Sequence, residues 1–330
     1  MPEPIVFPAL RDAQGRIISY LRLSLTDRCN FRCSYCSVSD YDDPSTVLAR
    51  EELSRLVALF ARLGVRRVRL TGGEPTLRKD LLAIARDTRE TPGIEEVAIT
   101  TNAHRLSELA SPLKQAGVEC VNASLDTLRP DRLTAISGRG ARLADVLAGI
   151  DGAATAGFTH LKVNTVVMGG VNDDELGDLV RFAWERGASP RFIELMPFGR
   201  GTPVPTARVK QLLRAQGVAL EPCDRRGWGP AHYMRGRGDG GRERLVGFIG
   251  AMTENFCERC NRVRMTADGD LQACLGGTAR VPLREILRAG ASDDAITARI
   301  REALAGKAER HHMDDGAGLV QLLPMMGVGG

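Results

Sequence analysis

Six of the eight cysteines in the sequence fall into two groups of three. The first group is Cys29, Cys33 and Cys36, and the second is Cys257, Cys260 and Cys274. A structural zinc site closes with four protein ligands, whereas a reactive metal site keeps one position open. The C-x3-C-x2-C spacing of the first group differs from the C-x2-C pairs of zinc ribbons, and thiolates are also the usual ligands of [4Fe-4S] clusters. The first group therefore predicts a reactive iron–sulfur site whose fourth iron is free for a reactant.

The second group leaves two interpretations open. Three cysteines suit an iron–sulfur cluster, but a C-x2-C pair also suits a zinc site that a distant residue completes. His232 lies too far upstream to be nominated as that residue. The two remaining cysteines, Cys120 and Cys223, stand alone, and we expect each to be a buried small hydrophobe.

Charge and composition argue against several classes of function. The 45 basic and 41 acidic residues leave a net charge of +4, which is too small to indicate a nucleic-acid-binding protein. The first residues, MPEPIVFPALRD, have neither the basic nor the apolar region of an export signal, and no apolar run approaches the length of a membrane span. We expect a cytoplasmic protein without nucleic-acid or membrane partners, in which reduced cysteines serve as metal ligands.

The elements that must position the first cysteines follow a repeating βα pattern. Short β-rich runs alternate with segments of helical period between about 18 and 198, and the expected strands are 18–26, 66–71, 95–101, 119–125, 160–167 and 191–195. Helices are expected at 50–64, 145–157 and 173–187. This pattern predicts an α/β fold, an incomplete (β/α)6 barrel of the TIM type.

Almost every expected strand ends in polar residues. The ends read Thr26-Asp27, Thr71-Gly72-Gly73-Glu74, Thr100-Thr101-Asn102, Ser124-Leu125-Asp126, Lys162-Val163-Asn164 and Glu194-Leu195-Met196. Catalytic groups of parallel barrels collect at the carboxyl ends of the strands. One such end could be a solvated loop, but all six together favour a functional site.

A second domain is expected after the barrel, because the composition changes to Pro, Gly and Arg near residue 199. We divide the chain into a partial barrel, 1–200, and a C-terminal domain, 201–330, which holds the second cysteine group. This domain is expected to contain a helix at 207–217 and antiparallel strands in 244–251 and 262–275, with a turn at Asp268-Gly269.

The cysteine loop resembles that of the radical S-adenosylmethionine (SAM) enzymes, in which the third cysteine follows an aromatic residue, here Tyr35. TGGEP at the next strand end resembles the glycine-rich element of the same enzymes. The resemblance implies that the free iron of a [4Fe-4S] cluster binds SAM and that the SAM contacts are Tyr35, Gly73, Ser124 and Met196.

A closer resemblance extends over essentially the whole chain. LRLSLTDRCNFRCSYC, SLDTLRPDRLTAISGRG, KVNTVVMGGVNDDEL, RFIELMPFG and FCERCNRVRMTADGDLQACL are similar to segments of the GTP 3′,8-cyclases, lyases that begin molybdenum cofactor biosynthesis. This resemblance implies a second [4Fe-4S] cluster on Cys257, Cys260 and Cys274, whose open iron contacts the guanine of GTP. It assigns GTP contacts to Arg22, Arg69, Thr100, Lys162, Arg262, Val263 and Arg264. Catalytic roles go to Cys29, Cys33, Cys36, Arg262 and Arg264.

The resemblance also implies partners. They are an electron donor such as flavodoxin or ferredoxin, a downstream cyclic pyranopterin monophosphate synthase, and a second copy of the chain in a homodimer. The terminal Gly329 and Gly330 are expected to enter the active site.

Some points stay open at the level of sequence. Thr101 could take the role of Thr100, and Ala103 stands where the family usually has glycine. The loop after Cys36, SVSDYDD, also departs from the family. Competing interpretations are another two-cluster radical SAM enzyme, such as a peptide-modifying maturase, and a zinc-stapled binding module.

Overall fold

The computed structural model describes residues 9–36, 46–138, 140–197, 200–227, 229–238, 241–311 and 313. Across these residues the strands form one 12-stranded sheet in the order β12-β11-β10-β1-β2-β3-β4-β5-β6-β9-β8-β7. The order ends at β12 on one side and at β7 on the other, so the sheet is open and not closed into a full barrel.

The six expected barrel strands are all present. They are β1 (Tyr20–Ser24), β2 (Arg67–Thr71), β3 (Glu96–Thr101), β4 (Val118–Ser124), β5 (His160–Val167) and β6 (Ser189–Glu194). Each pairs in parallel with the next along the chain. Their connections contain α1 (Arg50–Arg62), η1 (Pro75–Leu77), α2 (Leu81–Glu90), α3 (Leu106–Gln115), α4 (Pro130–Ser137), α5 (Leu143–Thr155) and α6 (Leu176–Glu185). The incomplete (β/α)6 barrel is therefore confirmed.

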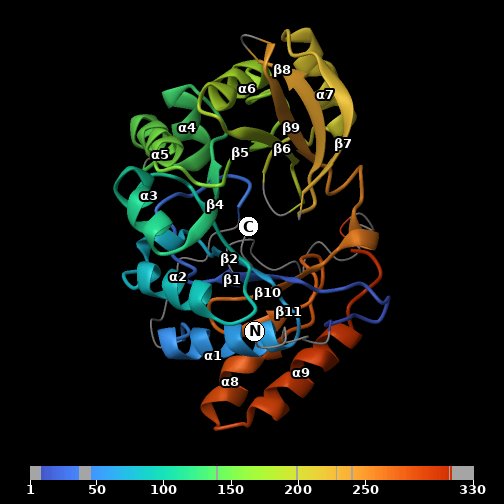
Figure 1. Ribbon diagram of the computed structural model, residues 1–330. Helices are drawn as coiled ribbons and strands as arrows, with labels where there is room; N and C mark the ends of the chain where they lie inside the picture. The colour runs from blue at the N-terminus through green and yellow to red at the C-terminus, as the bar shows by residue number, and fades with distance from the viewer. Residues whose placement is uncertain are drawn as a thin grey trace, which may run out of the picture.

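The helices form where the apolar spacing predicts them, with α1, α5 and α6 matching the expected ranges. Helix α1 buries Leu53, Leu56 and Phe60 on one face, and the chain leaves it through Gly64 at φ +99°. A φ in this region is accessible to glycine without strain, so Gly64 ends the helix. Figure 1 shows α1 to α6 along the outside of the sheet.

Residues after 200 contribute strands to both edges of the barrel sheet. These are β7 (Leu220–Arg226), β8 (His232–Arg237), β9 (Glu243–Ile249), β10 (Arg262–Met265), β11 (Asp270–Gln272) and β12 (Val281–Pro282), with α7 (Thr206–Ala215), η3 (Cys257–Arg259), α8 (Leu283–Arg288) and α9 (Asp293–Ala305). Helix α7 matches the expected range 207–217. The turn at Asp268-Gly269 is also present, with Gly269 at φ +87°.

The antiparallel expectation for these strands is only half right. Strand β9 is antiparallel to β8 but parallel to β6, and β10 is antiparallel to β11 but parallel to β1. The physical reason is that each edge of the barrel sheet offers unpaired backbone groups, which one strand of each C-terminal hairpin satisfies. A domain division near residue 200 stays a prediction, because the segments on its two sides share one sheet.

The last two helices pack against the first. Arg55 and Arg62 of α1 pair with Asp293 at the start of α9, at 2.9 and 2.6 Å. Glu52 of α1 pairs with Arg288 of α8 at 2.6 Å. Figure 1 shows α8 and α9 beside α1, so these two helices pack against the barrel that holds the first cysteines.

The two lone cysteines differ from each other. Cys120 on β4 is fully buried, as expected. Cys223 is only half-buried, so the expectation for it is wrong. It lies on β7, the last strand at one edge of the sheet, and its Sγ donates to the carbonyl oxygen of Tyr233 at 3.3 Å.

The loop after Cys36, which departs from the family, and the terminal Gly329 and Gly330 lie outside the described residues. No helix in the described part of the chain is long and apolar enough to cross a membrane.

Candidate active site

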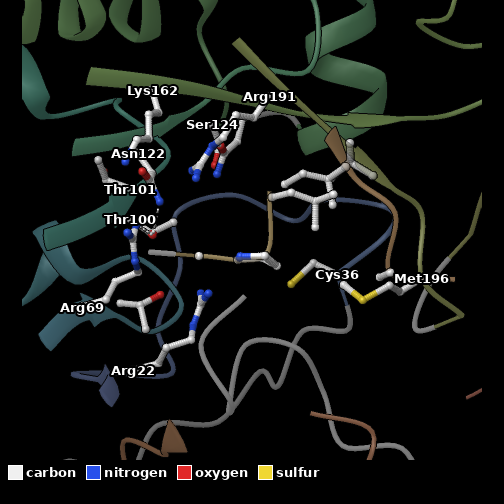
Figure 2. Close-up of a pocket in the computed structure, with 18 of the residues that line it drawn as sticks. Arg22, Cys36, Arg69, Thr100, Thr101, Asn122, Ser124, Lys162, Arg191 and Met196 are labelled. Carbon is white, nitrogen blue, oxygen red and sulfur yellow. Dashed lines mark hydrogen bonds between the residues drawn. The ribbon is translucent and has the colours of Figure 1, made fainter. Parts of the chain in front are cut away.

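A cavity opens at the carboxyl ends of the barrel strands and contains most of the expected site residues. Those that line it are Arg22, Cys29, Cys33, Tyr35, Cys36, Arg69, Gly73, Thr100, Ser124, Lys162, Met196, Arg262 and Arg264. Figure 2 shows Arg22, Arg69, Lys162 and Arg191 on one side of this cavity, and Cys36 and Met196 on the other.

The first three cysteines sit on a loop that α4 holds in place. The backbone N–H groups of Arg32 and Ser34 donate to the carbonyl oxygens of Ser137 and Ile136, each at 2.8 Å. The Sγ of Cys33 lies 3.4 Å from the hydroxyl of Ser137. Burial is the main cause that raises the pKa values of Cys33 and Cys36 to about 12, and the nearby Cys29 contributes to both shifts. Three half-buried thiols that face one cavity fit the donor set of an iron–sulfur cluster, whose binding would displace their protons.

The glycine-rich loop packs directly on the cysteine loop. A Cβ at Gly73 would lie 2.3 Å from the carbonyl oxygen of Arg28, and one at Gly72 would lie 2.3 Å from that of Thr26. The N–H of Gly73 donates to the oxygen of Thr26 at 2.7 Å. Only residues without a side chain allow this approach, and the resulting close packing beside the cysteines, which we call the Gly73 cradle, fits the expected SAM contact at Gly73.

Glu74 fastens this loop to the third strand. Its carboxylate is buried and accepts from the hydroxyl of Thr101 at 2.7 Å and from the backbone N–H of Asn102 at 2.7 Å. Thr100, in contrast, accepts from Arg69 at 3.1 Å. The structure thus directs Thr101 towards the glycine-rich loop and Thr100 towards the cationic side chains.

Tyr35 and Ser124 approach the cavity from different elements. The hydroxyl of Tyr35 donates to the carboxylate of Asp126 at 2.6 Å, and the other oxygen of Asp126 accepts from the N–H of Val166. Burial raises the pKa of Asp126 to about 6, although both hydrogen bonds oppose the shift. Ser124 lies at the end of β4, two residues before Asp126. The Tyr35 ring is therefore held between the cysteine loop and the end of β4.

Cationic side chains from neighbouring strands form one wall of the cavity. Strand pairing places Arg22 between Arg69 on β2 and Arg264 on β10. Lys162 on β5 and Arg191 on β6 complete the wall, which we call the cationic wall, together with Arg262. Arg69, Arg191 and Arg264 are buried, and burying several like charges is unfavourable unless an anion balances them, so the wall fits a polyanionic ligand.

The electrostatics of the cationic wall show this unfavourable burial. Burial lowers the pKa of Lys162 to about 8, and Arg191 and Arg69 add to the shift. Burial likewise lowers the pKa of Arg264 to about 10, with Arg262 adding to it. An anion bound here would favour the charged forms of both groups.

The second cysteine group lies next to the cavity without lining it. Phe256, Leu275, Arg262 and Arg264, which flank these cysteines in the chain, do line it. Burial raises the pKa of Cys257, and Cys274 and Cys260 contribute in the same direction. Within the part of the chain that the structure describes, no three His, Cys, Asp or Glu side chains converge on one metal-ion position.

Val263 is the remaining predicted residue, and its side chain does not reach the cavity. Alternation along β10 places Arg262 and Arg264 on the cavity side and Val263 in the hydrophobic core, fully buried. A contact of Val263 with a ligand stays a prediction.

Sequence reasoning missed Arg191 and Asn122 as site residues, and it placed Asp126 and Glu194 at strand ends without giving either a role. Arg191 is 6% exposed and donates through Nε to Asn164 at 2.8 Å. The signal for it was a charged residue at the first position of the expected strand 191–195. Asn122 lies two residues before Ser124, on the same face of β4, and lines the cavity.

Comparison with known proteins separates the chain into two matched regions. Residues 23–183 match the radical SAM superfamily model, and residues 188–313 match the model described as Molybdenum Cofactor Synthesis C. A protein of Heliobacterium modesticaldum named GTP 3′,8-cyclase is 45% identical, with 93% of this chain and 96% of that protein covered. One of Ectopseudomonas mendocina with the same name is 43% identical over 96% of this chain and 98% of its own.

The fold is shared with more distant solved structures. Streptococcus suis SuiB, crystallised with S-adenosylmethionine, superposes with a TM-score of 0.63 at 16% identity, covering 91% of this chain and 75% of that one. At this identity the likeness concerns the fold alone. Together, the two matched regions and the near full-length relatives show that the chain belongs to the radical SAM family of GTP 3′,8-cyclases.

Proposed function

We propose that the protein is a lyase that converts GTP to (8S)-3′,8-cyclo-7,8-dihydroguanosine 5′-triphosphate, the first step of molybdenum cofactor biosynthesis. The observation that carries the proposal is one cavity lined both by three thiols and by the cationic wall. Thiols suit a redox-active cluster, and the wall suits a triphosphate.

The first cysteine group would hold a [4Fe-4S] cluster. When bound, such a cluster supplies the electron that cleaves SAM to methionine and a 5′-deoxyadenosyl radical. The chain's own contribution is positioning: the Gly73 cradle, Tyr35, Ser124 and Met196 surround the place beside the cysteines where SAM would lie. Enclosure by the barrel would keep water away from the reacting atoms.

The opposite side of the cavity would bind GTP. Arg22, Arg69, Lys162 and Arg191 present positive charge to the triphosphate, with Arg suited to gripping two oxygens at once. Thr100 offers a hydroxyl next to Arg69. A second [4Fe-4S] cluster on Cys257, Cys260 and Cys274 would lie next to Arg262 and Arg264, where the guanine is expected.

The partners implied by this activity are part of the proposal. A small electron-transfer protein, such as flavodoxin or ferredoxin, would reduce the first cluster, and cyclic pyranopterin monophosphate synthase would consume the product. We also propose cytoplasmic location, a homodimer, and the division of the chain into a barrel of residues 1–200 and a cluster-bearing region of residues 201–330.

The chemistry is tested by the origin of the abstracted hydrogen. Because only near-attack geometry selects one ribose position, GTP deuterated at C3′ should deliver its label into 5′-deoxyadenosine. GTP deuterated at C2′ or C4′ should not, and this is the matched control. Label from another ribose position, or from solvent alone while cyclised product still forms, would refute the mechanism.

The competing interpretations predict different measurements. A peptide-modifying maturase would have no need for a buried cationic wall, and GTP would not bind to it. A zinc-stapled module would be colourless after anaerobic reconstitution and would contain zinc without iron or sulfide. Iron and sulfide content, combined with GTP binding, separates all three.

A further inference from the structure

Lys307 is a buried cation outside the cavity. It follows α9 directly after Gly306, and only 3% of its surface is exposed. An ammonium group removed from water is costly unless a negative or strongly polar partner compensates. The partners of Lys307 therefore indicate what it does.

One partner is a cysteine of the second group, and the other lies two residues after it. The Nζ of Lys307 donates to the Sγ of Cys260 at 3.5 Å and to the carbonyl oxygen of Arg262. The sulfur of Cys260 and the carbonyl oxygen of Arg262 are therefore the groups that compensate the buried ammonium.

Arg16 fixes the segment that carries Lys307. One guanidinium nitrogen of Arg16 donates to the carbonyl oxygens of Cys257 and Glu309, at 2.9 and 2.7 Å. The other donates to the carbonyl oxygen of Ala308 at 2.8 Å. Arg16 is itself held by Asp12 at 2.6 Å. The residues after Lys307 are therefore tied to the same loop of cysteines, so the lysine cannot swing away without breaking these bonds.

We propose that Lys307 is a positioning residue for the second cluster, which holds the Cys260 thiolate through a charge-assisted N–H···S hydrogen bond and raises the reduction potential of that cluster. This rests on the proposed function, which places a cluster on Cys260. Hydrogen bonds to ligand sulfurs and nearby charge are the means by which proteins set such potentials. A positive charge beside a cluster stabilises the reduced, more negative form.

The proposal is tested with Lys307→Met, Lys307→Gln and Lys307→Arg. Methionine keeps the length but removes both donor and charge, glutamine keeps a donor, and arginine keeps both. Lys79→Met, at an exposed position, is the matched control. Midpoint potentials are measured by electron paramagnetic resonance during redox titration of anaerobically reconstituted protein, in a Cys33→Ser background that retains the second cluster alone.

The expected result is a potential that becomes more negative in the order wild type or Lys307→Arg, then Lys307→Gln, then Lys307→Met, while Lys79→Met does not change it. In a Cys260→Ser background, which reports the first cluster, Lys307→Met should have no effect. Equal potentials in wild type and Lys307→Met, or lower iron content with an unchanged potential, would overturn the proposal and leave a structural role. A Cys33→Ser protein that binds no iron would instead refute the second cluster itself.

Discussion

The strongest prediction from the structure concerns Lys162 and pH. Lys162 is half-buried in the cationic wall, and its pKa is lowered to about 8, first by removal from water and then by Arg191 and Arg69. Its Nζ lies 3.3 Å from the Sγ of Cys120, which partly opposes the shift. The free protein therefore loses this positive charge between pH 7 and pH 9.

The size of the effect on GTP binding follows from that pKa. If the triphosphate binds the charged lysine, the dissociation constant rises with the fraction of neutral lysine, and GTP binding weakens about tenfold, or about 1.4 kcal/mol, from pH 7 to pH 9. Against the effect of burial, Arg262 and Lys307 lower the pKa of Cys260 to about 7, so the measurement uses reconstituted protein, in which Cys260 would be a cluster ligand. The pKa of Arg264, about 10, lies above this pH range, and burial and Lys162 lower the pKa of His160, so that imidazole stays neutral. Phosphate oxygens, with a second pKa near 6, are already ionised.

The assay is anaerobic equilibrium dialysis of GTP at pH 7, 8 and 9 and constant ionic strength. Lys162→Arg should flatten the profile, because a guanidinium stays charged throughout. Lys79→Arg, at an exposed position, should keep the wild-type loss. Wild-type affinity that does not change with pH, or a Lys162→Arg profile with the same tenfold loss, would refute the assignment of Lys162 to the triphosphate.

Three further predictions concern the same cavity. Cys33→Ser should abolish reductive cleavage of SAM, whereas Cys260→Ser should retain uncoupled cleavage and lose cyclisation; wild-type cyclisation by Cys260→Ser would contradict the second cluster. Arg262→Ala or Arg264→Ala should weaken GTP use while iron content stays at the wild-type level, and unchanged turnover in both would remove the main objection to a peptide substrate. In Gly73→Ala the new Cβ would meet the Arg28 carbonyl at 2.3 Å, so 5′-deoxyadenosine formation should fall by about a hundredfold, and near wild-type rates would show that the cradle is not used.

Local pattern predicted the barrel well but not the neighbours of its edge strands. Alternation and helical period are properties of short segments, so β1 to β6 and their helices could be placed from sequence. The pairing of β10 with β1 joins residues about 240 positions apart, as in the match of Arg22 with Arg264. No local pattern specifies which edge of a sheet a distant strand will join, and this pairing is what brings Arg264 into the cavity.

The site residues also divide into those that the local sequence predicted and those that it did not. Polar residues at strand ends indicated the cavity, since parallel strands present their carboxyl ends at one edge. Arg191 was missed because it lies earlier in its strand, and its access to the cavity depends on the pairing of β6 with Asn164 of β5. Lys307 was missed for a different reason: it lies far from Cys260 in the chain and contacts it only through the packing after α9.

Ala103 adopts a left-handed backbone conformation of the kind that favours glycine. It has φ +63°, a conformation that costs alanine about 1 kcal/mol relative to glycine. Its N–H donates to the hydroxyl of Thr101 at 3.1 Å, and its carbonyl oxygen accepts from the N–H of Leu106 at 3.0 Å. A Cβ at Gly149 would lie 2.0 Å from that carbonyl oxygen, so the close approach of α5 depends on glycine there. These contacts hold residue 103 in the left-handed conformation. The position that requires glycine is Gly149, on the neighbouring helix α5.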